Sequence, residues 1–269
     1  AFQRIPHRRR EKTVWYPLAL IVPIFFIFGL VFGSFSNALI YRIPSKEYTI
    51  FKPRRSVCPS CKHELAWKDN IPLFSYLTLK GRCRYCGSKI SPRYPLVELM
   101  TASLYALNAA LFPLSEAISL SLMVTGLVVS AFIDLEHYMI PDSGVILVGL
   151  GSFFWAFFRG RFPENLIGAL IVTGAMVAFF LIANQFRKDS FGFGDVELLA
   201  VLSLATGILG SLYTIMIAAF VALASYAIAS AVKRRKFDRL AQLPFGPFIA
   251  SAGYLTVLVL DLIEGLYAF

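Results

Sequence analysis

Long stretches without a charged residue alternate with short charged segments along the chain. A transmembrane helix needs about 20 apolar residues, with a working range of about 17 to 25. Six uncharged stretches reach or approach this length, at positions 13–41, 99–115, 117–133, 143–158, 165–186 and 241–260. A seventh stretch, 198–232, would be about 50 Å long as one helix, so we expect it to fold back near Gly207 to Gly210 as two spans. The pattern therefore predicts an all-α, polytopic membrane bundle of about eight helices.

The composition excludes a water-soluble globular protein. Hydrophobic residues make up 57% of the chain and charged residues only 16%, whereas an average soluble domain has about 25% charged residues. The net charge of +10 does not indicate nucleic-acid binding. The basic residues flank apolar stretches, where they set topology and meet anionic lipid headgroups. We therefore expect membrane lipid as a partner and no nucleic acid.

The distribution of basic residues predicts the orientation. If the spans alternate, segments 42–93, 134–142, 187–197 and 233–240 share one side and hold 19 of the 26 Lys and Arg residues. The positive-inside rule makes that side cytoplasmic. A basic tail, residues 1–12, falls on the opposite side. The stretch after it is longer than the apolar region of a signal peptide and lacks a clear cleavage site, so we interpret it as an uncleaved helix.

These assignments divide the chain into four parts. They are the basic tail (1–12), a first transmembrane helix (13–41), a cytoplasmic cysteine module (42–93) and a transmembrane bundle (94–269). Within the first helix, Gly29 and Gly33 have the small-xxx-small spacing that lets two helix backbones approach closely.

The cysteine module contains all four cysteines of the chain, as two C-x-x-C pairs. Cys58 and Cys61 form the first pair, and Cys83 and Cys86 form the second after 21 intervening residues. Two such pairs supply four thiolates for a tetrahedral Zn²⁺ site with no open position, so the zinc would be structural. Two disulfides or an iron–sulfur centre are the alternatives, which the reducing cytosol and the adjacent basic residues disfavour.

Two acidic residues that border apolar stretches are candidates for catalysis. Asp134 and Asp195 both fall at the predicted cytoplasmic boundary, on helices that a bundle can bring together. Two carboxyls that share a site cannot both ionise, so one activates water while the protonated one polarises a peptide carbonyl. Gly192 and Gly194, which form a G-x-G-D motif with Asp195, would let the backbone approach a substrate closely and so support the site. The motif alone is a weak signal, since a Gly-rich turn followed by an Asp N-cap also starts ordinary helices.

Other acidic residues have simpler interpretations. Asp142 follows a proline and precedes an apolar run, so we expect it to cap a helix next to the acidic pair. Glu136 and His137 lack the H-E-x-x-H spacing of a catalytic zinc site. We expect Asp261 and Glu264 at the membrane–water interface on the non-cytoplasmic side of the bilayer.

The motifs together resemble the type IV prepilin peptidases, which belong to the G-x-G-D class of intramembrane aspartyl proteases. The likeness runs from about Gly29 to about Phe248 and includes both cysteine pairs and both acidic segments. Further matching segments are 33–37, 41–44, 67–72, 75–77, 81–87 and 90–98. The resemblance implies a bacterial inner-membrane enzyme that removes the basic leader of prepilins and pseudopilins after a Gly. It also implies S-adenosylmethionine-dependent methylation of the new N-terminal amine.

The resemblance also implies roles for particular residues. Asp134 and Asp195 match the catalytic aspartates of the family, in its D-x6-P-D and G-x-G-D segments. Methyl transfer is associated with the cysteine-bearing loop, where Gly81 and Arg82 occupy a position linked to it. One departure is Glu197, which stands where the family commonly has Lys and which bears on the pH optimum and on contacts with the leader.

Two other classes of function stay open at this point. A proton-coupled transporter or channel would use Asp134 and Asp195 as a relay and the zinc-bearing loop as a regulatory domain, but it predicts acids near the middle of the membrane. A non-catalytic assembly scaffold would tolerate Asn at both positions.

Overall fold

The computed structural model describes residues 18–45, 47–186, 192–232 and 243–267. Within these ranges the chain forms eight α-helices and one 3-10 helix, and it contains no β-strand. The helices are α1 (Leu18–Arg42), η1 (Trp67–Asn70), α2 (Phe74–Thr78), α3 (Arg93–Leu111), α4 (Leu114–His137), α5 (Asp142–Phe158), α6 (Phe162–Phe186), α7 (Phe193–Val232) and α8 (Gly246–Tyr267). The predicted all-α class is confirmed. The predicted basic tail 1–12 lies outside the described residues.

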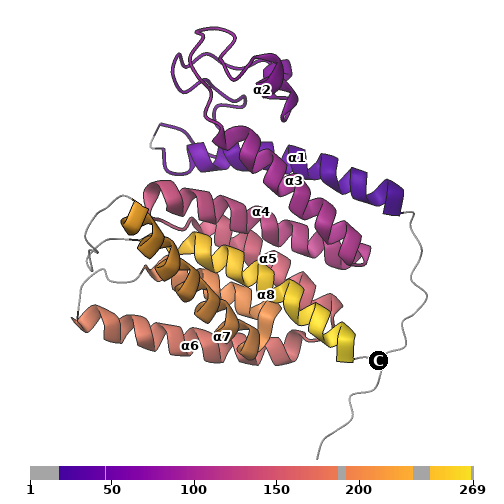
Figure 1. Cartoon of the computed structure of the whole chain (residues 1–269), viewed down its shortest axis with the longest axis vertical. Coiled ribbons are helices and arrows are strands. Elements are labelled where there is room, and N and C mark those ends of the chain that lie inside the picture. The colour runs from indigo at the N-terminus through magenta and orange to yellow at the C-terminus, as the bar shows by residue number, and fades with distance from the viewer. Residues whose placement is uncertain (1–17, 46, 187–191, 233–242, 268–269) are drawn as a thin grey trace, which may run out of the picture.

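The helices form a membrane bundle with a small lobe at one side. Helices α1, α4, α6, α7 and α8 are long and apolar enough to cross a membrane, and α5 is a shorter apolar helix of 17 residues. Figure 1 shows the cysteine module as a separate lobe beside α1 and α3, with α6 on the opposite side of the bundle. The protein is therefore a multi-pass membrane protein, as predicted.

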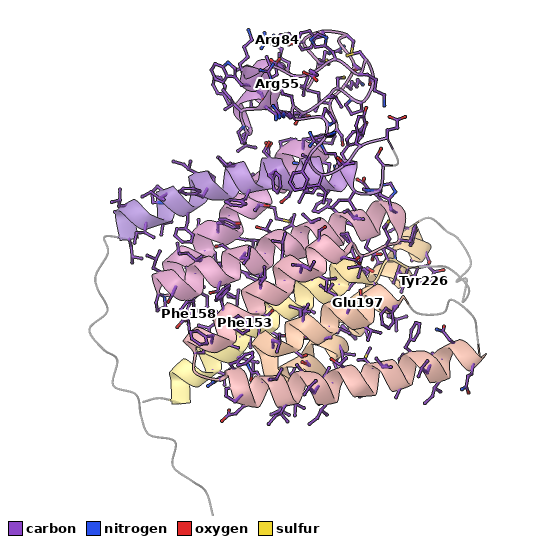
Figure 2. All side chains as sticks on the ribbon, turned by 180° about the vertical axis from the view of Figure 1, so that it is seen from behind. Arg55, Arg84, Phe153, Phe158, Glu197 and Tyr226 are labelled. Atoms are coloured by element: carbon purple, nitrogen blue, oxygen red, sulfur yellow. The ribbon has the colours of Figure 1, made fainter. Side chains whose placement is uncertain are left out.

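Helix α7 folds back on itself, which confirms the prediction of two spans. Gly207 interrupts it with φ 65° and ψ −173°, a backbone conformation that glycine adopts most readily. Leu202 packs against Gly253 of α8, and Thr214 donates a hydrogen bond of 3.2 Å to Thr256 of the same helix. Figure 2 shows Glu197 and Tyr226, from the two halves of α7, at the same end of the bundle.

A side chain from α6 satisfies the backbone where α7 breaks. The Asn165 amide of α6 donates a hydrogen bond of 2.8 Å to the Leu204 carbonyl, three residues before Gly207. Broken helices are tolerated inside membranes when neighbouring side chains satisfy the freed backbone groups in this way. The two halves of α7 thereby become distinct passes.

Close packing of glycines joins α1 to α3. A Cβ atom added at Gly29 would lie 2.5 Å from the Ala102 Cα, and one added at Gly33 would lie 2.7 Å from the Glu98 Cα. Neither position has room for a larger residue, because the contacted atoms belong to backbone. The small-xxx-small spacing therefore does bring two helix backbones together.

The predicted boundaries of the second span, 99–115, are wrong at both ends. Helix α3 begins at Arg93 and ends at Leu111. Charged residues do not end the helix because each has a partner. Arg93 donates two hydrogen bonds, of 2.6 and 2.7 Å, to Glu136 of α4, and Glu98 accepts one of 2.8 Å from the Leu73 N–H.

Ion pairs of one arginine connect three helices at the end of the bundle that lies away from the aspartates. Arg159, just after α5, is paired with Glu116 of α4 and Asp261 of α8. Its guanidinium also lies 4.4 Å from the centre of the Trp155 ring. Asp261 is thus part of a three-helix ion network, not simply an interfacial acid.

Candidate functional site

Asp134 lies in the last turn of α4 and faces the beginning of α8. Its side chain is 6% exposed, and its Oδ2 atom accepts a hydrogen bond of 2.8 Å from the Gly246 N–H. Gly246 is the first residue of α8, so the positive end of that helix dipole points at the carboxyl group. A Cβ added at Gly246 would lie 2.9 Å from Oδ2, so a larger residue there would displace the Asp134 carboxyl. These contacts hold the carboxyl in one orientation.

Asp195 lies in the first turn of α7 and is 9% exposed. Its N–H donates a hydrogen bond of 3.2 Å to the Gly192 carbonyl. A Cβ at Gly192 would lie 3.2 Å from the Asp195 Oδ2, and one at Gly194 would lie 2.9 Å from the Ile140 Cβ. The two glycines therefore let the start of α7 approach the α4–α5 connection and leave room for the carboxyl group.

The two carboxyl groups lie at the same end of the bundle. Asp134 is in the last turn of α4, and Gly194, next to Asp195, packs against Ile140 in the connection that follows α4. Helix α8 packs against both α4 and α7, and its first residue contacts Asp134 directly. The arrangement provides two buried acids and one backbone N–H at the same end of the bundle. Such a pair is suited to acid–base hydrolysis.

Asp142 does not cap α5 in the way that we expected. It is the first residue of the helix, Pro141 precedes it as the N-cap, and no side chain makes a capping hydrogen bond. The Pro141 carbonyl already accepts the Gly144 and Val145 N–H groups, so the helix starts one residue early. The Asp142 carboxylate lies in the first helical turn, where a negative charge is favourable.

Three residues at this end of the bundle were not identified from the sequence. They are Gly246, which contacts Asp134, Ile140, which packs against Gly194, and Arg93, which pairs with Glu136. Only Gly246 carries a local signal, since a proline follows it at the start of an apolar run. Ile140 and Arg93 contact residues that are distant in sequence, so no local pattern indicates them.

The four cysteine sulfurs form a candidate metal centre in the cysteine module. All four Sγ atoms lie within 4.8 Å of one another. Equivalent hydrogen bonds shape the two pairs: the Lys62 N–H donates to the Cys58 carbonyl, and the Gly87 N–H donates to the Cys83 carbonyl, both at 2.9 Å. Lys62 and Gly87 both have positive φ, of 59° and 71°. The sulfurs can hold one metal ion.

The neighbouring thiols shift each other's pKa values. Burial opposes ionisation of Cys58, but hydrogen bonds from the Cys61 and Ser60 backbone outweigh it and lower the pKa of Cys58. At Cys61 a hydrogen bond from the His63 backbone favours the thiolate, but desolvation and the nearby Cys58 and Cys86 outweigh it and raise the pKa. One thiol thus ionises at the expense of its neighbour. A divalent cation lets all four carry charge.

Gly81 and Arg82 lie in the cysteine module, apart from the aspartates. Gly81 has φ 66°, and a Cβ there would lie 3.1 Å from the Tyr76 hydroxyl oxygen. Its carbonyl accepts the Ile90 N–H at 2.8 Å. The Arg82 backbone forms an isolated antiparallel β-bridge with Lys89, and Arg82 is exposed. Gly81 therefore maintains a tight turn beside the second cysteine pair.

Comparisons with known proteins agree with this arrangement. Residues 27–112 match the bacterial peptidase A24 N-terminal domain, and residues 121–228 match the type IV leader peptidase family. A "Type 4 prepilin-like proteins leader peptide-processing enzyme" of Escherichia coli is 35% identical over 90% of this chain and 95% of its own length. A "Prepilin leader peptidase/N-methyltransferase" of Aeromonas salmonicida is 32% identical over 92% of this chain and 94% of its own. No solved structure matches. The chain belongs to the type IV leader peptidase family.

Proposed function

We propose that this protein is an inner-membrane aspartyl endopeptidase that removes the basic leader from prepilins or pseudopilins and then N-methylates the new N-terminus. The observation that carries the proposal is the buried carboxyl pair, Asp134 and Asp195, at one end of the bundle. Membership of a family whose relatives are named prepilin leader peptidase/N-methyltransferase supports both activities.

In the proposed hydrolysis the two aspartates exchange protons with water and the peptide. The ionised carboxylate takes a proton from water, whose oxygen attacks the scissile carbonyl carbon, while the protonated carboxyl donates to the carbonyl oxygen. When the tetrahedral intermediate collapses, the C–N bond breaks and the leaving amine receives a proton from the pair. The Gly246 N–H keeps Asp134 oriented during these transfers.

The positions of the acids and of the basic residues support a cytoplasmic site. Asp134 and Asp195 lie at helix ends, where a leader bond at the membrane surface is accessible. The cysteine module is strongly basic, which favours the cytoplasmic side and contact with anionic lipid. A transporter relay would instead need acids near the middle of the membrane.

We assign Zn²⁺ to the four cysteines and S-adenosylmethionine to the methyl-transfer reaction. A closed four-thiolate site gives zinc a structural role, holding a module whose only buried residues, among those described, are Cys58, Asp69 and Cys83. S-adenosylmethionine supplies an electrophilic methyl group on a sulfonium. The protein's part is to bind the peptide amine and to remove its proton.

The test is to incubate the purified protein with a prepilin, with and without S-adenosylmethionine, and to analyse the products by mass spectrometry. Release of the leader after Gly and a mass gain of one methyl on the mature chain are expected. An intact prepilin after prolonged incubation would contradict the peptidase function. A cleaved but unmethylated chain would contradict the methyltransferase function alone.

A further inference from the structure

A cavity separates the cysteine module from helices α1 and α3. Its volume is about 380 Å³, which lies within the range of small-ligand sites. Side chains from three parts of the chain line it: Asn37 from α1, Glu98 from α3, and Asp69 and Arg84 from the module. Cys58 and Cys83 also border it, so the metal centre supports one wall. Figures 1 and 2 show the module, with Arg84, as a lobe beside α1.

Two buried polar atoms in the lining have no hydrogen-bond partner. One is an acceptor, the Asn37 Oδ1, on a side chain that is 2% exposed. The other is a donor, the Arg93 Nε. Unsatisfied buried polar atoms are rare and costly in folded proteins, and each calls for a partner. The N-terminal residue of a peptide offers the complementary groups, because its amine donates and its carbonyl accepts.

Glu98 offers a local site for a cationic ligand, in a lining that also contains Arg42 and Lys89. Arg84 is paired with Asp69 at 2.7 Å, and Arg93 is paired with Glu136 at 2.6 Å. Glu98, which is 7% exposed, has no such cationic partner among the described ion pairs. Its Oε2 accepts one hydrogen bond of 2.8 Å from the Leu73 N–H. A carboxylate with spare acceptor capacity is suited to an ammonium group.

We infer that this cavity is the methyl-transfer site and that Glu98 and Asn37 bind the α-amino group of the cleaved pilin. The inference rests on the proposed function and deepens it by naming the residues that receive the acceptor amine. The amine enters as an ammonium ion and passes one proton to the Glu98 carboxylate. Its lone pair then forms a bond to the methyl carbon as the carbon–sulfur bond breaks, and that electron pair stays on sulfur. The products are a methylated ammonium and a neutral thioether, and Glu98 returns its proton to water.

This assignment predicts recognition of a free amine without any turnover. The test uses the full-length protein in lipid nanodiscs and two synthetic peptides of the mature N-terminus, one with a free N-terminal amine and one N-acetylated. The wild-type protein should bind the free amine about tenfold more tightly, the effect of one charge-assisted hydrogen bond. Glu98→Gln, which keeps an acceptor for the Leu73 N–H, should lose this preference. Asn37→Ala should weaken it.

Controls separate recognition from folding. Ser36→Ala lies beside Asn37 on α1 but removes only a hydroxyl that donates to the Phe32 carbonyl of the same helix, so it should behave as wild type. Glu98→Gln should still cleave prepilin while methylating the pre-cleaved pilin at least about tenfold more slowly. An unchanged preference and methylation rate in Glu98→Gln would overturn the inference, as would a parallel loss of cleavage. A wild-type protein that cleaves but never methylates would instead refute the proposed methyltransferase function.

Discussion

Asp195 depends on two neighbouring glycines for its place in the site. A Cβ at Gly194 would lie 2.9 Å from the Ile140 Cβ, so Gly194→Ala should push the start of α7 away from the α4–α5 connection. Misplacement of a catalytic group by about 1 Å costs roughly 100-fold in rate, so we expect leader cleavage to fall by about 10- to 100-fold. Gly174→Ala is the matched control, because no atom lies within 4 Å of a Cβ at that position. Equal cleavage by both variants would contradict this account of Gly194.

The kinked helix α7 depends on one hydrogen bond from a different helix. Asn165→Leu removes the side-chain donor to the partly buried Leu204 carbonyl. Hydrogen bonds between membrane helices contribute about 0.6 kcal/mol on average and up to about 1.7. We therefore expect a measurable fall in the thermal unfolding temperature in detergent. Thr173→Val, which removes a hydroxyl bonded only within α6, should cause a smaller fall, and the reverse order would disprove this role of Asn165.

The number and reversals of the helices were predictable from the sequence because local features determine them. Uncharged length predicts the spans, and Gly207 gives the position where α7 turns. The start of α3 and the environment of Asp134 were not predictable in this way. Glu98 is stabilised by Leu73, and the Gly246 N–H reaches Asp134 from a position 112 residues further along the chain. No local pattern reveals contacts of that separation.

In the candidate site, too, features set by local sequence were predictable and features set by distant contacts were not. The cysteine spacing alone predicts that four sulfurs converge, and they do. The prediction that Asp142 caps α5 was wrong, because the Pro141 carbonyl competes successfully for the first N–H groups. The cavity beside Glu98 depends on the docking of the cysteine module onto two helices, which no single motif encodes.

Across the whole molecule, the metal centre and the aspartates lie in different parts, so the two activities should separate. Cys83→Ser should impair methylation more than cleavage, because Cys83 borders the proposed methyl-transfer cavity. Cleavage lost before methylation would show that the module supports the peptidase geometry instead.

The metal content of the purified protein tests the metal centre itself. We expect about one zinc per chain by elemental analysis, since four ligands complete one site. Four free thiols without metal would refute the zinc site.

A variant that loses cleavage should also be able to keep methylation. Asp195→Asn should block cleavage and still methylate a supplied pre-cleaved pilin, because the methyl-transfer cavity is lined by α1, α3 and the module and not by α7. Methylation is measured as the mass gain of the mature chain. A variant that folds yet cannot methylate this substrate would indicate one shared site.

The central claim is that Asp134 and Asp195 together hydrolyse the leader bond. The most direct measurement is leader release from a prepilin, followed by mass spectrometry, for purified Asp134→Asn and Asp195→Asn. Each variant should express and insert normally yet release no leader, because an amide serves neither as the acid nor as the base. Asp142→Asn, at the start of α5, should keep most of the activity as a control. Leader release by either Asp134→Asn or Asp195→Asn at the wild-type rate would contradict the account.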